Sequence, residues 1–125
     1  MVSADLLLRL DERLKSFDDV HEKFRHEGIW SDGITGPETN ADWIRFEAYM
    51  GFFERIYTFV TKGLLDLAYV NDFYEYRYGN IVENRTIVEQ KLEGEEASSW
   101  TRFIELGKLL GRYPVKSAPS AEEGD

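Results

Sequence analysis

Residues 43–63 read WIRFEAYMGFFERIYTFVTKG, and the rest of the chain is arranged around this stretch. Residues three, four and seven apart share one face of a helix, because each residue turns the helix by about 100°. One such face is apolar throughout and carries Trp43, Phe46, Met50, Phe53, Tyr57 and Val60. Further apolar side chains widen this face to an arc of roughly 200°, namely Tyr49, Phe52, Ile56 and Phe59. A single neighbour cannot cover such an arc, so the pattern predicts a central helix over 40–62 that contacts at least two others.

A second helical pattern begins after a glycine and covers 66–92. Its apolar stripe consists of Val70, Phe73, Tyr74, Ile81, Val88 and Leu92. Arg77 and Asn84 lie inside this stripe. An unpaired charge is costly to bury, so Arg77 needs an acceptor. A short loop makes the two helices antiparallel neighbours, and we therefore expect Arg77 to pair with Glu54 or Glu47 of the central helix, with Asn84 close by.

Two shorter patterns complete the predicted fold. An amphipathic helix is expected over 4–26 and a last helix over 98–111. Glycines and a proline predict a long loop over 28–40, and three apolar side chains should pin that loop to the core, namely Ile29, Trp30 and Ile34. The predicted fold class is therefore all-α. It is an antiparallel bundle of four helices that forms a single domain over 1–113, followed by a disordered acidic tail over 114–125.

The composition argues against several classes of protein. None of the 125 residues is cysteine, which rules out thiol chemistry, iron–sulfur clusters and thiolate zinc sites. The net charge of −9 opposes binding to nucleic acids and to anionic membranes. The first residues lack the basic and apolar regions of a signal peptide, and no uncharged apolar stretch approaches about 18 residues. We expect a cytoplasmic protein with no membrane span and no nucleic-acid partner.

The two histidines do not predict a metal site. His21 and His26 are five residues apart, so on a helix they point about 140° away from each other, whereas a zincin helix needs a spacing of four. The Glu-x-x-His pairs of dimetal bundles are absent from the sequence, as are phosphate-binding glycine loops and nucleophile elbows. The sequence therefore predicts no metal, no cofactor and no enzymatic activity.

A wider pattern covers roughly 41–88. It consists of an aromatic helix carrying Phe-Glu, a glycine at its end and a following helix opened by an aspartate. The residues that form it are Arg45, Tyr49, Phe53, Glu54, Ile56, Gly63, Asp66, Val70 and Arg77. This pattern resembles the central part of a family of bacterial helical proteins that is catalogued only as a domain of unknown function. The resemblance implies a helical fold and brings no catalytic residues.

Two classes of function follow, and the first is favoured. Aromatic surface in excess of the core predicts a non-enzymatic interaction or regulatory module that self-associates as a homodimer through Tyr69, Tyr76, Tyr78, Phe52 and Phe59. The alternative is a small-molecule binding or sensing domain, in which a pocket between helices is lined by Arg77, Glu54, Glu47, Asn84, Tyr57 and Tyr74. The module predicts one continuous exposed aromatic patch, whereas the sensing domain predicts a cavity whose walls include Arg77.

Overall fold

The central helix, α3, covers Asn40–Thr61 in the computed structural model, which describes residues 3–113. Thr39 caps its start, because the side-chain oxygen accepts a hydrogen bond from the Asp42 N–H at 3.0 Å. Gly63 follows its end with φ of 75°, a conformation that glycine adopts without steric cost. The helix predicted over 40–62 is confirmed. The all-α class is also confirmed, since the described residues contain no strand.

The segment predicted as one helix over 4–26 is divided into two, α1 (Ala4–Lys15) and α2 (Asp18–Phe24). Between them the Ser16 hydroxyl donates to the Arg13 carbonyl at 2.5 Å, and the Ser16 carbonyl accepts a hydrogen bond from Arg45 of α3. Phe17 is fully buried, and its ring centroid lies 5.3 Å from that of Tyr49 on α3. The interruption turns Phe17 into the core, so burial of this ring outweighs the helical hydrogen bonds that are lost.

The connection from α2 to α3 covers 25–39 and is anchored by one aromatic side chain. Trp30 is buried, with its ring 5.1 Å from that of Phe24 and 5.9 Å from that of Phe46. The predicted anchoring by Ile29 and Ile34 is wrong, because these side chains are 64% and 61% exposed. The segment is held through its backbone instead, since the carbonyls of Gly33, Ile34 and Thr35 accept hydrogen bonds from the Arg85 N–H, the Thr86 hydroxyl and the Asn84 amide.

Four shorter helical pieces replace the single helix predicted over 66–92, namely α4 (Leu67–Phe73), α5 (Glu75–Val82), α6 (Arg85–Ile87) and the π-helical turn η1 (Val88–Leu92). Tyr74 separates the first two with φ of −122° and ψ of −15°. Asn84 begins α6, because its side-chain oxygen accepts from the Ile87 N–H at 3.0 Å. Its amide donates to the Thr35 carbonyl at 2.9 Å, which ties the preceding loop to α6.

The last helix, α7 (Thr101–Leu109), follows the 3₁₀ turns of η2 (Gly94–Trp100) and therefore starts later than the predicted 98–111. Tyr78 of α5 holds it in place: its hydroxyl donates to the Phe103 carbonyl at 2.6 Å, and the two rings stack with centroids 4.5 Å apart. Gly107 makes this approach possible, since a methyl group there would overlap the Tyr78 hydroxyl.

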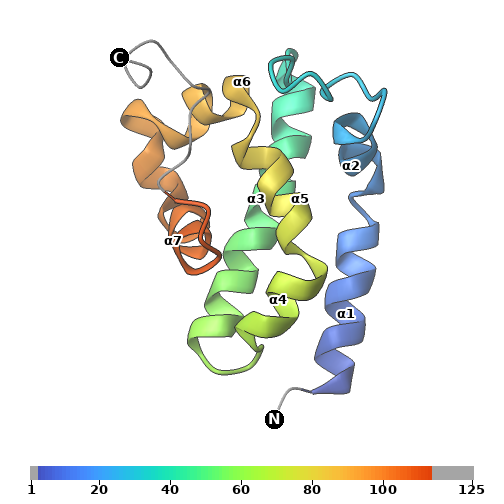
Figure 1. Cartoon of the computed structure of the whole chain (residues 1–125), viewed down its shortest axis with the longest axis vertical. Helices are drawn as coiled ribbons and strands as arrows, with labels where there is room; N and C mark the ends of the chain where they lie inside the picture. Colours follow the sequence, from blue (N-terminus) through green and yellow to red (C-terminus); the bar gives the residue numbers. More distant parts are fainter. Residues whose placement is uncertain (1–2, 114–125) are drawn as a thin grey trace.

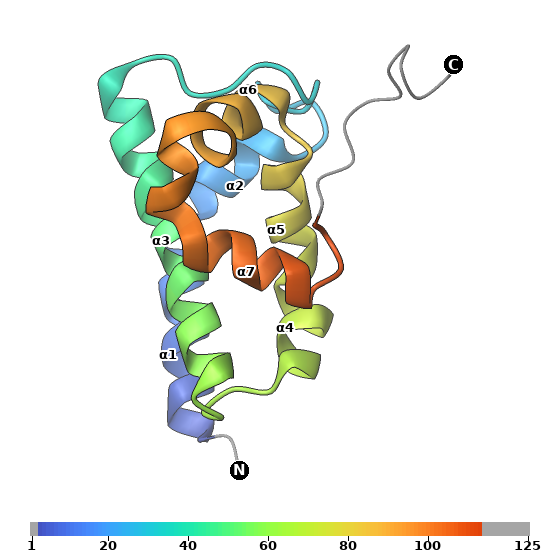
Figure 2. The same ribbon diagram turned by 90° about the vertical axis from the view of Figure 1, so that its left-hand side faces the viewer.

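Three columns of helix run in alternating directions: α1 with α2, then α3, then α4 with α5 (Figure 1). Figure 2 shows α7 lying across α3 and α5, and Figure 1 shows it nearly end-on. The predicted bundle of four antiparallel helices is thus not confirmed, because only three columns are antiparallel and α7 crosses them. The predicted tail over 114–125 lies outside the described residues.

Candidate functional site

The predicted pair between Arg77 and Glu54 is wrong. The Arg77 Nη2 atom lies 3.4 Å from Asp18 Oδ1 on α2, and Nε donates to the hydroxyl of Tyr76 at 3.3 Å. The Arg77 side chain is only 12% exposed. Because α5 starts afresh at Glu75, Arg77 faces α2 instead.

The three other polar residues predicted beside Arg77 serve separate junctions. Glu54 accepts a hydrogen bond from the Phe103 N–H at 3.2 Å and so satisfies an unpaired donor in the first turn of α7. Glu47 pairs with buried Lys91 at 2.6 Å, and Asn84 caps α6. The structure therefore does not bring Arg77, Glu54, Glu47 and Asn84 together.

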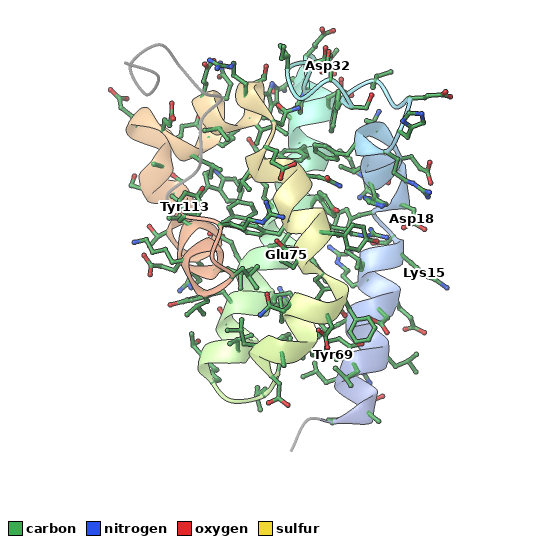
Figure 3. All side chains as sticks on the ribbon, viewed as in Figure 1. Lys15, Asp18, Asp32, Tyr69, Glu75 and Tyr113 are labelled. Atoms are coloured by element: carbon green, nitrogen blue, oxygen red, sulfur yellow. The ribbon has the colours of Figure 1, made fainter. Side chains whose placement is uncertain are left out.

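Two of the predicted aromatic residues contact the same carboxylate, that of Asp11, which was not among the predicted site residues. Buried Tyr74, predicted to bind a ligand, donates to Asp11 Oδ1 of α1 at 2.6 Å. Tyr69, which Figure 3 shows between α4 and α1, approaches the same carboxylate at 3.4 Å. Burial and the bond to Asp11 raise the pKa of Tyr74, which keeps it protonated. Tyr74 joins α4 to α1 and has no exposed surface to offer a ligand.

The remaining predicted residues divide between core and surface. Tyr78 is 0% exposed, so the prediction that its ring is free to meet a partner is wrong, and Phe52, at 4% exposed, keeps only a small part of its ring at the surface. Phe52 packs on Tyr74 and Tyr78 packs on Phe53, so both rings serve the core. Tyr57 and Phe59 are half-buried, and Tyr76 is 52% exposed. The exposed aromatic residues thus do not form the single continuous patch that was predicted.

A polar cluster surrounds Arg77 on its inner side and draws on α2, α3 and α5. The buried atoms His21 Nδ1, Tyr49 Oη and Arg77 Nη1 have no hydrogen-bond partner within residues 3–113. Burial, reinforced by the positive charge of Arg77, lowers the pKa of His21 and favours its neutral form. Burial also raises the pKa of Tyr49, so its hydroxyl stays protonated. These three residues form the polar cluster.

A polar pocket of about 550 Å³ opens beside the polar cluster, between α2 and α5. Both histidines of the chain contribute to its wall, which consists of Asp18, His21, Glu22, Phe24, Arg25, His26, Tyr76, Arg77 and Asn80. Its two ion pairs are long, with Arg77 to Asp18 at 3.4 Å and Arg25 to Glu22 at 3.7 Å. Charge-assisted hydrogen bonds are usually about 2.7–2.9 Å, so neither arginine is tightly held. This is the α2–α5 pocket.

A second concave surface, of about 460 Å³, lies between α1 and α3. Its floor is apolar and consists of Leu6, Leu10, Phe52 and Phe59, with the small residues Ala48 and Gly51 between them. Its rim carries Arg9, Arg13 and Arg55. We refer to this surface as the α1–α3 groove. Phe52 and Phe59, both predicted as interface residues, are brought together here.

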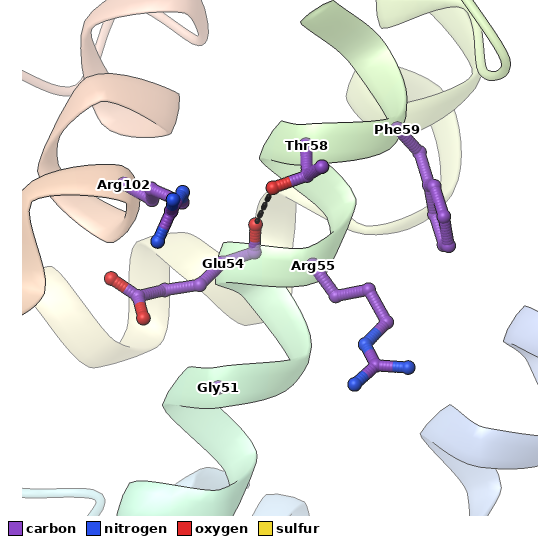
Figure 4. A pocket seen from close by; sticks show the side chains of 6 residues that line it. All are labelled: Gly51, Glu54, Arg55, Thr58, Phe59 and Arg102. Atoms are coloured by element: carbon purple, nitrogen blue, oxygen red, sulfur yellow. Dashed lines mark hydrogen bonds between the residues drawn. The ribbon is translucent and has the colours of Figure 1, made fainter. Parts of the chain in front are cut away.

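The α1–α3 groove continues around α3 into a shallower hollow of about 380 Å³ beside α7. Figure 4 shows Arg55 and Phe59 on one side of α3, with Glu54 and Arg102 on the other. Gly51 and Arg55 contribute to both hollows. A methyl group at Gly51 would have no neighbour within 4 Å among the described atoms, so the backbone of α3 is open to an approaching molecule at this point.

Tyr49 was expected only on the apolar face of the central helix, and neither Asp18 nor the three arginines of the groove was predicted as a binding residue. The one usable signal was His21, which stands in the apolar stripe of its helix. The arginines occupy the polar side of ordinary amphipathic patterns and give no signal until two helices bring them together. Within residues 3–113, no three His, Asp or Glu side chains gather closely enough to hold a metal ion. None of the helices described there is long and apolar enough to cross a bilayer.

Comparison with known proteins gives no relative from which a function can be transferred. No protein-family model, no curated protein and no solved structure matches this chain. The resemblance of residues 41–88 to a bacterial family of unknown function therefore stays a prediction.

Proposed function

We propose that this chain is a non-enzymatic interaction module whose α1–α3 groove binds an acidic amphipathic helix of a partner protein. The observation that carries the proposal is the pairing of an apolar floor with an arginine rim, on a chain whose net charge is −9. An amphipathic helix offers the complement, with apolar side chains on one face and carboxylates beside them.

The shape of the groove supports a helical occupant. Leu6 and Leu10 lie one turn apart on α1, while Phe52 and Phe59 lie two turns apart on α3. Two turns of helix span about 10 Å, a length over which a bound helix presents side chains at i, i+3 or i+4, and i+7. Gly51 leaves the centre of the groove open for close approach.

The charges of the groove favour an acidic occupant. Arg13 and Arg55 take part in no ion pair within the described residues, and Arg13 lies over the Phe17 ring at 5.1 Å. Arg9 pairs only with Asp5 on the same helix, and both side chains are at least 70% exposed. Exposed pairs of this kind contribute little. Carboxylates of a partner would thus meet guanidinium groups that are nearly free to respond.

A second copy of the chain is a poor occupant of this groove. In a two-fold symmetric dimer the same patch meets itself, so arginine would face arginine. We propose that self-association, predicted above, uses the aromatic surface of α4. Tyr69 and Phe73 lie there with ring centroids 4.6 Å apart, and Phe73 is 55% exposed.

A peptide-binding experiment tests the proposal. The probe is a labelled helical peptide of about 18 residues with leucines on one face and glutamates elsewhere, and its partner probe replaces each glutamate by lysine. Fluorescence anisotropy should show saturable binding of the acidic peptide, weakening as salt is added. The affinity for the lysine peptide should be lower by about tenfold or more.

Charge reversal locates the binding surface. Arg55→Glu should weaken binding of the acidic peptide by about tenfold or more. Arg85→Glu, at a 56% exposed arginine of α6, is the matched control and should leave binding unchanged. Equal binding of the two peptides, or equal loss in the two variants, would contradict the proposal. Size-exclusion chromatography of Phe73→Ser tests the separate proposal for self-association, which fails if the elution volume does not change.

A further inference from the structure

The polar cluster contains more hydrogen-bond donors than acceptors. A guanidinium carries five N–H donors and no acceptor. For Arg77, the structure provides Asp18 at 3.4 Å and the Tyr76 hydroxyl at 3.3 Å, both of them weak contacts. Arg77 Nη1 and the Tyr49 hydroxyl lie near each other without a hydrogen bond of good geometry, and no other group in residues 3–113 pairs with either of these two buried donors. Neutral His21 adds a third when its proton is on Nδ1.

Unmet buried donors of this kind are costly. A buried donor that lacks a partner has lost its hydration without compensation, and a charged donor loses more than a neutral one. The chain keeps three of them side by side on different helices. Functional sites are where such unsatisfied groups concentrate, because a ligand supplies the missing acceptor.

The α2–α5 pocket gives the size of that ligand. Its volume of about 550 Å³ is much larger than the roughly 30 Å³ that one water molecule occupies. It falls within the range of small-molecule pockets in proteins, about 300–1,000 Å³. Arg25 and Asn80 add further donors at its wall, and Tyr76 and Phe24 add aromatic surface.

The pocket charges give the ligand class. Arg77 and Arg25 favour an anion, while Asp18 and Glu22 on the same wall oppose a second negative charge. A planar carboxylate can accept two parallel hydrogen bonds from a guanidinium. We infer that the α2–α5 pocket binds a small organic monocarboxylate, whose carboxylate accepts from Arg77 and Tyr49. This site is separate from the α1–α3 groove and does not depend on it.

Entry of the carboxylate requires one side chain to move. Arg77 Nη1 and Tyr49 Oη are both buried. Tyr76 is the least restrained group beside them, since it is 52% exposed, packs edge-on against His21 at 5.6 Å and holds Arg77 through a 3.3 Å bond. In this proposal, rotation of Tyr76 toward solvent opens the way from the pocket wall to Tyr49, which does not itself line the pocket.

The test is a solution NMR titration of the full chain with benzoate, benzamide and inorganic phosphate as probes. Benzoate should shift the Arg77 Nε–H signal and the backbone amides of α2 and α5 in a saturable manner. Benzamide has the same shape without the charge and should bind about tenfold more weakly. Phosphate, with its second charge, should also bind more weakly than benzoate.

Three variants make the result specific to the polar cluster. Arg77→Lys should weaken benzoate binding by about tenfold, because lysine keeps the positive charge but lacks the planar guanidinium that donates two parallel hydrogen bonds. Tyr49→Phe should weaken it severalfold and keeps the shape of the core, so it remains informative if Arg77→Lys fails to fold. Arg85→Lys, on α6, should change nothing. The inference is overturned by shifts that do not saturate, by equal binding of benzamide, or by an equal loss in Arg85→Lys.

Discussion

Tyr78 and Tyr49 are both fully buried, yet their hydroxyls end in opposite situations. The Tyr78 hydroxyl donates to the Phe103 carbonyl at 2.6 Å, whereas the Tyr49 hydroxyl has no partner within residues 3–113. Phe53 of α3 contacts both rings, with centroids 5.7 Å from Tyr78 and 5.3 Å from Tyr49. At the α5–α7 crossing, which we call the completed junction, the Tyr78 hydroxyl is therefore satisfied, although the buried Tyr113 hydroxyl near it has no partner among the described residues. The α2–α5 side carries polar groups that the fold itself does not satisfy.

The difference arises from what each neighbouring helix offers. At the crossing, α7 presents a backbone carbonyl and a glycine that lets the hydroxyl reach it. On the other side, α2 presents His21, whose exposed fraction is 7% and whose Nδ1 atom is also unpaired among the described residues. A core can tolerate a few unsatisfied groups, and their position is informative because stability alone would remove them.

The largest expected effect concerns the completed junction. Phe103→Ala removes a fully buried ring that contacts Phe53 and Tyr78. We expect the free energy of unfolding to fall by about 3–5 kcal/mol, measured by urea denaturation. Leu109→Ala, at a 44% exposed position of the same helix, is the control and should change little. If Phe103→Ala loses under about 1 kcal/mol, α7 is not docked as described.

Removal of one hydroxyl at the same junction has a smaller effect. Tyr78→Phe leaves the ring in place but deletes the donor to the Phe103 carbonyl. The free energy of unfolding should fall by about 1–3 kcal/mol, because the Phe103 carbonyl is then buried without the donor that it had. Thermal denaturation followed by circular dichroism measures it. An unchanged melting temperature would show that the Tyr78 hydroxyl does not stabilise the α5–α7 crossing.

Glu54 belongs to the completed side as well, rather than to Arg77. Glu54→Ala deletes the acceptor of the Phe103 N–H and should cost about 1 kcal/mol. Glu54→Gln keeps an acceptor oxygen and should recover most of that loss. A double-mutant cycle with Arg77→Ala should give no coupling beyond about 0.5 kcal/mol, and a large coupling would restore the predicted pair.

The unsatisfied side should show itself in the pH dependence of stability. Burial and the charge of Arg77 hold the pKa of His21 below the ordinary value of 6.5. The unfolded chain therefore binds more protons below pH 6.5, and His21 destabilises the fold progressively as the pH falls through that value. His21→Gln should reduce this loss when urea denaturation is compared above and below pH 6.5, whereas His26→Gln should not. Identical slopes in both variants would contradict the assigned environment of His21.

The sequence was sufficient for α3 and for the helical class, because ten apolar side chains at helical spacing leave no other economical arrangement. It was not sufficient for the breaks at Phe17 and Tyr74. Neither break contains glycine or proline, and each exists because a ring is better placed in the core or on Asp11 of another helix. Such tertiary preferences override local propensity and leave no local pattern.

The same limit applies to the candidate site. Arg77 was recognisable as a charge inside an apolar stripe, but its surroundings depended on the break that separates α4 from α5. Asn84 was placed in the same stripe although asparagine is a good helix cap, which was the signal available for the start of α6. The predicted partners Glu54 and Glu47 were wrong because the prediction assumed one continuous helix over 66–92. The periodicity of the sequence did not show the breaks within it.

The most direct test of the central comparison is the stability of Tyr49→Phe, measured by urea denaturation beside Tyr78→Phe. Because the Tyr49 hydroxyl is buried without a partner in the described residues, its removal should leave the free energy of unfolding unchanged or raise it. A loss of about 1 kcal/mol or more, comparable to that of Tyr78→Phe, would mean that the hydroxyl is already satisfied in the free protein and would contradict the account.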